Sequence, residues 1–132
     1  MMPNAPEILN PVIHHISQAQ LAKYADASGD DNPLHLDEEF AATTPYGRTI
    51  AHGMLLLAFV SEAMTKAFGL TWLCEGKMKA RFRAPVFPGD TVTTTGTLKS
   101  TTGTMAMYQI VVRNQGGVDV VTADTTTPIF SL

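Results

Sequence analysis

The sequence predicts an α+β fold in which helices come first and a curved antiparallel sheet then packs on one long helix. Three observations support this prediction: a long apolar segment, one strand with strict alternation, and three further strand-like segments joined by short turns. The 132 residues suit a single domain spanning residues 1–132. A composition of 45% hydrophobic and 16% charged residues is typical of a globular protein.

The long helix is predicted over GMLLLAFVSEAMTKAF, which begins at Gly53 and is followed by Gly69 as a stop. Residues 54–60 are all apolar, whichever side of a helix they would face. Such a segment is typical of a helix buried on every side. A helix of this length needs a sheet around it, which is why the rest of the chain is expected to wrap it.

The first half of the chain is predicted to hold a short strand at residues 11–16 and then a helix. Ser17 and Gln20 are spaced as a capping box at the start of that helix, and Gly29 is a natural stop. The residues after Gly29 read as a loop rich in Asp, Asn and Pro. A second short helix is expected to start at Asp37, because acidic residues favour the positive end of a helix.

The second half is predicted to form four strands. In the first, KMKARFRA, basic and apolar side chains alternate strictly, which predicts a strand with one wet face. A turn follows in VFPGD, and shorter turns separate the other strands. Those strands are expected at residues 91–99, 105–113 and 118–130. Consecutive strands with short turns indicate an antiparallel sheet.

Composition excludes several classes of protein. A net charge of -3 argues against a nonspecific nucleic-acid binder, and a single cysteine, Cys74, rules out an internal disulfide framework. The first ten residues lack the basic start and apolar run of a signal peptide, and no segment reaches the ~18 apolar residues of a membrane span. We therefore expect a cytoplasmic protein, with Cys74 serving as a small apolar filler.

The stretch SGDDNPLHLD carries the strongest functional signal. Asp30 and His35 are five residues apart, a spacing that neither a helix nor a strand would place on one side. A bent loop can bring them together, because Pro33 biases Asn32 away from helix and Asn32 can brace a turn. A carboxylate and an imidazole aimed at one point can hold a water, remove its proton and return a proton nearby.

Other interpretations of this loop remain open or fail on spacing. Clusters of Asp, Asn, Pro and Gly are most often plain turns. A calcium-binding EF-hand loop would need a glycine where Asp31 stands and a glutamate where Asp37 stands, so that pattern fails. For zinc, His35, His52 and Cys74 look scattered along the chain, so we predict no metal site and no cofactor.

The start of the long helix is a second candidate site. The first backbone N–H groups of a helix lack partners, and Gly53 would let a ligand approach the amide closely enough to stabilise an oxyanion. Ser61 lies two turns further along; a lone serine in an apolar helix usually bonds back to the chain, but it could also touch a ligand. The basic side chains of residues 77–83 form either a solvated face or an attraction for the phosphates of a carrier such as coenzyme A.

The motif resembles a known family. Tyr24, a short spacer, SGDDNPLH, LDEEF and Ala41, followed by YGRTIAHGMLL, closely resemble the R-specific enoyl-CoA hydratases of the MaoC-like dehydratase family. The resemblance covers nearly the whole chain. It implies a single hot-dog fold, a long central helix wrapped by an antiparallel sheet, and a homodimer. It also implies reversible addition of water to trans-2-enoyl thioesters to give R-3-hydroxyacyl thioesters.

The resemblance also implies roles for individual residues. Asp30 and His35 would be the catalytic pair that holds the water, and the backbone amide of Gly53 would bind the thioester oxygen. Ser61 and Asn32 would be substrate-binding residues, and Asn32 would contribute by shaping the loop. Two alternatives stay open, a hot-dog acyl-CoA thioesterase and a noncatalytic acyl-thioester-binding subunit of a dehydratase complex. The acyl chain length, the pathway and the carrier (coenzyme A or acyl carrier protein) are not fixed by the sequence.

Overall fold

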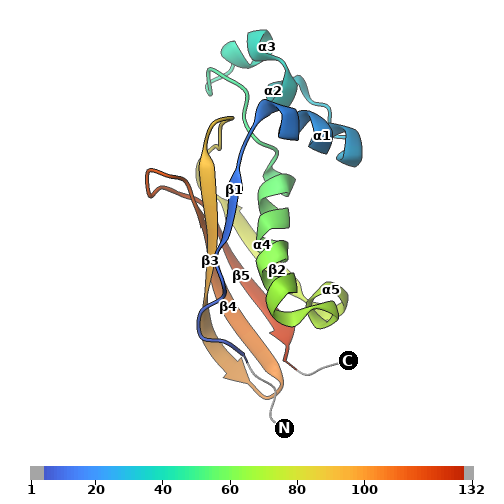
Figure 1. Ribbon diagram of the computed structural model, residues 1–132, viewed down its shortest axis with the longest axis vertical. Helices are drawn as coiled ribbons and strands as arrows, with labels where there is room; N and C mark the ends of the chain where they lie inside the picture. Colours follow the sequence, from blue (N-terminus) through green and yellow to red (C-terminus); the bar gives the residue numbers. More distant parts are fainter. Residues whose placement is uncertain (1–4, 130–132) are drawn as a thin grey trace.

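A computed structural model describes residues 5–129, in which helices gather at one end and along one face of a single antiparallel sheet (Figure 1). The predicted end of the last strand, Phe130, lies outside the described residues. In chain order the elements are β1 (Val12–His15), α1 (Gln18–Ser28), α2 (Pro33–Leu36), α3 (Glu38–Ala42), α4 (Gly53–Phe68), α5 (Leu70–Glu75), β2 (Lys77–Phe82), β3 (Thr91–Thr102), β4 (Met105–Arg113) and β5 (Asp119–Pro128).

The sheet has the order β1-β3-β4-β5-β2, with every neighbouring pair antiparallel. The predicted antiparallel sheet is therefore confirmed. β2 does not pair with β3, the next strand in sequence. It pairs instead with β5 at the edge of the sheet, where Met78 lies opposite Thr125. α4 lies along one face of the sheet, and the core between them includes the fully buried Val60, Met64 and Tyr108 (Figure 1).

The prediction that the apolar start of the long helix is buried on every side is wrong for the single chain. Leu55, Leu56 and Phe59 are buried, but Met54 is 63% exposed. A helix that lies on one sheet face keeps a second side turned away from that sheet (Figure 1). The wrapping in this chain is thus one-sided.

Local start and stop signals act as the sequence predicts. The Ser17 hydroxyl accepts a hydrogen bond from the backbone N–H of Gln20 at 3.1 Å, which caps α1. Gly29 ends α1 with a φ of 81°, a left-handed conformation that glycine adopts at little cost, and Gly69 follows α4 with a φ of 60°. The predicted short helix begins after its cap residue Asp37.

Two segments differ from the prediction. Residues 33–36 were expected as loop but form one helical turn, because Pro33 stands at its first position and the Asn32 side chain accepts from the N–H of Leu34 at 2.9 Å. The sequence also gave no signal for α5. A Cβ at Gly76, just after α5, would collide with the ring and the backbone oxygen of Trp72, so only glycine fits there.

Within residues 5–129, no helix is both long and apolar enough to cross a membrane.

Candidate active site

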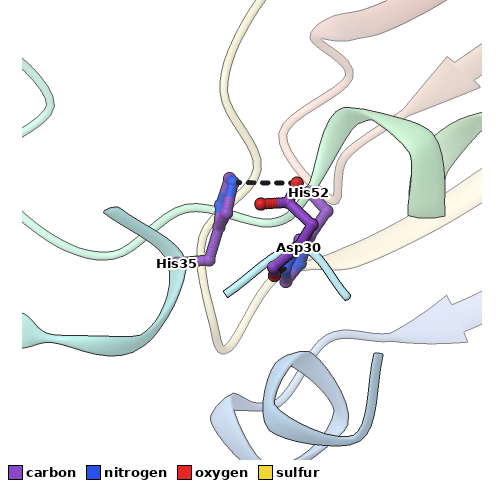
Figure 2. Close-up of side chains that lie close together, drawn as sticks. All are labelled: Asp30, His35 and His52. Atoms are coloured by element: carbon purple, nitrogen blue, oxygen red, sulfur yellow. Dashed lines mark hydrogen bonds and ion pairs between the residues drawn. The ribbon is translucent and has the colours of Figure 1, made fainter. Parts of the chain in front are cut away.

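Local structure places Asp30 and His35 side by side. The Ser28 hydroxyl accepts from the N–H of Asp30 at 3.1 Å, and the turn that follows leads into α2, which carries His35. As a result Asp30 Oδ2 lies 3.9 Å from His35 Nε2 (Figure 2). That distance is too long for a direct hydrogen bond, yet one water lying beside the line between the atoms can contact both.

Backbone contacts fix the His35 imidazole. Its Nδ1 lies 2.8 Å from the carbonyl oxygen of Ile50, which can only accept, so Nδ1 carries the hydrogen. The Gln18 side chain also donates to the backbone carbonyl of His35 at 2.7 Å, which ties α2 to α1. In the neutral imidazole the remaining nitrogen, Nε2, is therefore the acceptor, and it faces Asp30.

The two members of the pair have different surroundings. The Asp30 side chain is 52% exposed, whereas the His35 side chain is 11% exposed. The carboxylate thus stays in contact with water while the imidazole is held against the protein. This arrangement suits a pair that receives a water from outside and directs it inwards.

His52 completes the cluster, and the sequence analysis missed it. Its ring stacks on His35 with 3.9 Å between ring centroids and 25° between planes, and its Nε2 donates to the backbone carbonyl of Asp30 at 3.0 Å. Figure 2 shows the three side chains together. The earlier view that His35 and His52 are scattered is therefore wrong. One signal in the sequence could have found it, because His52 directly precedes the long apolar helix. Only the neighbouring Gly53 was considered there as a site residue.

Burial keeps His52 neutral. The side chain is only 1% exposed, and this burial lowers the pKa of its imidazole. The hydrogen bond to the carbonyl of Asp30 raises this pKa, whereas the neighbouring His35 adds to the lowering by burial. The net shift of the pKa is downward. Its second nitrogen, Nδ1, is buried and has no hydrogen-bond partner among the described residues.

The same three side chains form the one group whose ligand atoms could approach a metal ion in residues 5–129. Those atoms lie within 4.8 Å of one another. The two imidazole planes, however, are nearly parallel and 3.9 Å apart. Ring nitrogens bind metals along their own plane, so stacked rings cannot both aim at one ion, and the geometry does not fit a resident metal.

A pocket of about 490 Å³ opens beside the pair. His35 and Gly53 line it, together with the side chains of Leu56, Phe82 and Arg83. Gly53 is the first residue of α4, where backbone N–H groups lack partners within the helix. A Cβ at Gly53 would lie 2.8 Å from the Phe82 ring, so glycine allows the edge strand to approach the start of the helix.

The other two predicted substrate residues do not line the pocket. The Asn32 side chain caps α2, which agrees with a role in shaping the loop. Ser61 lies two turns along α4 and accepts a hydrogen bond from the indole N–H of Trp72 at 2.9 Å. In the single chain the structure brings Asp30 close to His35, and His35 lines the same pocket as Gly53, whereas Asp30 itself does not line that pocket.

Known proteins share both the sequence and the fold. Residues 6–120 match the MaoC like domain family. An (R)-specific enoyl-CoA hydratase of Aeromonas caviae is 44% identical over 78 residues, 57% of this chain and 56% of that protein. One of Rhodospirillum rubrum is 37% identical over 83 residues, 63% of this chain and 58% of that protein. The match thus spans little more than half the length of these curated relatives.

A solved structure extends the match to almost the full chain. The (R)-hydratase from A. caviae involved in PHA biosynthesis has a TM-score of 0.81 and 30% identity, and covers 96% of this chain and 98% of that one. A MaoC-like dehydratase structure from R. rubrum, at 22% identity and a TM-score of 0.74, shares the fold. The predicted α+β hot-dog fold is confirmed. The chain belongs to the MaoC-like domain family.

Proposed function

We propose that this chain adds water reversibly to trans-2-enoyl thioesters and gives R-3-hydroxyacyl thioesters. The observation that carries the proposal is the 3.9 Å separation of Asp30 Oδ2 and His35 Nε2 beside the pocket that Gly53 lines. The names of the relatives from A. caviae and R. rubrum support the same reaction class. Asp30 and His35 are the catalytic residues of this proposal.

The reaction begins with one water held by the pair. Its two hydrogens point to the Asp30 carboxylate and to Nε2 of His35, both of which are acceptors. The water oxygen bonds to C3 of the enoyl group while one of its protons passes to the pair. The pair then returns a proton to C2, so one water is consumed and no other reactant is needed.

Negative charge builds on the thioester oxygen as the water attacks. The backbone N–H of Gly53, at the positive end of α4, stabilises this charge. Removal of one such donor typically costs about 2.7–4 kcal/mol in the barrier. The pocket beside His35 and Gly53 takes the acyl part of the substrate.

The carrier is a partner of the same site. Lys79, Arg81 and Arg83 line a groove of about 230 Å³ on the sheet face away from α4, and Arg83 also lines the pocket. We expect these cations to attract the phosphates of coenzyme A. Arg81→Gln should then raise KM for crotonyl-CoA but leave KM for crotonyl-N-acetylcysteamine, which has no phosphate, unchanged. Equal KM changes for both thioesters would contradict this expectation.

A homodimer is the second expected partner interaction. β2 is an edge strand, and Phe82 on it is 57% exposed, while Met54 at the start of α4 is 63% exposed. A second copy would cover these apolar side chains next to the pocket. Light scattering coupled to size-exclusion chromatography measures the mass directly, and a monomer at micromolar concentration would contradict the expectation.

The test of the function is hydration of crotonyl-CoA, followed as loss of the enoyl-thioester absorbance. A thiol assay and an S-specific hydroxyacyl-CoA dehydrogenase run in parallel. Loss of absorbance without free thiol, with a product that the S-specific enzyme ignores, is the expected result. Free thiol would instead identify a thioesterase. No reaction with short or long acyl chains would contradict the hydration of acyl-CoA thioesters and leave either a thioester of acyl carrier protein as the substrate or a noncatalytic binding subunit.

A further inference from the structure

We propose that His52 is a positioning residue that holds Asp30 and His35 at their working separation through one hydrogen bond and one ring stack. The inference rests on the proposed hydratase function, because it concerns the same pair. It adds a residue to which neither the motif nor the comparisons assign a role.

The hydrogen bond ties the catalytic loop to the long helix. His52 precedes α4 and donates from Nε2 to the carbonyl oxygen of Asp30 at 3.0 Å, across 22 residues of sequence. The other hydrogen bonds described for Asp30 are local: its own N–H donates to the Ser28 hydroxyl, and its side chain accepts from the N–H of Asn32 at 3.4 Å. The bond from His52 therefore sets where this half-exposed loop lies relative to the pocket.

The ring stack fixes the position of His35, the second member of the pair. One face of His52 packs on His35 at 3.9 Å, and the ring of Tyr24 from α1 meets His52 edge-on at 4.8 Å. The backbone that leads into His52 is itself fixed, since the N–H of Ala51 donates to the carbonyl of Val86 at 2.7 Å. His35 thus packs against a ring whose position is fixed by its neighbours.

Neither nitrogen of His52 is free for proton transfer to a substrate. Nε2 carries the hydrogen that bonds to Asp30, and Nδ1 is buried without a partner among the described residues. A protonated ring would place an unsatisfied N–H in the core and a positive charge against His35. The titratable groups that face His52 are Tyr24, Asp30 and His35. Its contribution is geometric, and it depends on the ring staying neutral.

Two variants separate the hydrogen bond from the ring. His52→Phe keeps a ring against His35 but removes the donor to Asp30, whereas His52→Gln keeps an N–H donor and removes the ring. The matched control is His14→Phe, because His14 is the other stacked histidine, 4.0 Å from the Phe59 ring and outside the pocket. Each protein is assayed with crotonyl-CoA for kcat and KM from about pH 6 to 9, the range around the ordinary histidine pKa, and its Tm is measured.

We expect kcat of His52→Phe to fall by about 10²-fold, the cost of misplacing a catalytic group by about 1 Å, with KM within about threefold. His52→Gln should recover about tenfold of that loss and keep the wild-type pH profile, since a residue that only positions the pair exchanges no proton with the substrate. The control should keep wild-type kcat. The recovery of kcat in His52→Gln is the readout that a merely structural role would not produce, and the pH profile separates a positioning residue from an acid or base.

Wild-type kcat in His52→Phe would overturn the inference. The inference would also be overturned by equal losses of kcat in the two variants, by losses of kcat that follow Tm alone, or by a failure of both variants to fold. Each of these results would make the role of His52 structural. A changed pH profile in His52→Gln would make His52 an acid or base instead. Failure of the proposed function is a separate result, because the wild-type protein would then hydrate no enoyl thioester.

Discussion

Replacing Asp30 with Asn should leave the protein folded and nearly inactive. The side chain is 52% exposed, and its single described hydrogen bond, from the N–H of Asn32, is 3.4 Å long. The Oδ1 atom of an asparagine can accept the same bond. Substitutions of this kind usually change stability by no more than about 0.5 kcal/mol, which corresponds to about 2 °C in Tm for a domain of this size.

The expected effect on the reaction is much larger. A neutral amide cannot take a proton from the water that the pair holds, and loss of such a group typically costs about 10²–10⁴ in rate. That loss equals about 2.7–5.4 kcal/mol in the barrier, several times the expected change in stability. The measurement is kcat for hydration of crotonyl-CoA, with thermal unfolding of the same sample.

The neighbouring acid supplies the control. Asp31 is exposed and carries the same charge one residue away, so Asp31→Asn changes the net charge identically without touching the pair. Its kcat should stay within about twofold of wild type, as expected for a surface substitution away from the site. A folded Asp30→Asn protein with wild-type kcat, or an equal loss in Asp31→Asn, would refute the assignment of Asp30.

Three further predictions follow from the packing. Gly53→Ala should lower kcat/KM about tenfold or more with little change in Tm, since the new methyl group displaces the exposed Phe82 ring beside the pocket. Ser61→Ala should cost about 1–3 kcal/mol in urea unfolding, because the buried Trp72 indole loses its acceptor; a loss of kcat at unchanged stability would instead place Ser61 at the substrate. Burial raises the pKa of Tyr108 to about 12, so stability that is complete below pH ~10 is lost as pH rises towards 12. Tyr108→Phe should therefore lose less stability than wild type between pH ~10 and ~12, and equal losses in the two proteins would contradict this effect of Tyr108.

Signals confined to a few residues could be interpreted correctly from the chain alone. The Ser17 cap and the glycine stops at Gly29 and Gly69 act through backbone conformation and hydrogen bonds within about one turn. Asp30 and His35 belong to the same class, because the turn after Ser28 and the single helical turn of α2 decide whether they come close. The alternation predicted over residues 77–84 is correct for Met78 and Ala80, which pack against the core, but β2 ends at Phe82 and that side chain is exposed.

Contacts between segments that are far apart in the sequence were decided only by the tertiary structure. Pairing of β2 with β5, rather than with the next strand in sequence, depends on where α4 and α5 deliver the chain, which no local pattern encodes. The contact of His52 with Asp30 and His35 joins residues up to 22 apart, and the Trp72 indole meets Ser61 across a turn between two helices. Short-range backbone preferences thus determined most of the elements and the closeness of Asp30 and His35, whereas long-range packing determined which residues hold those two side chains in place.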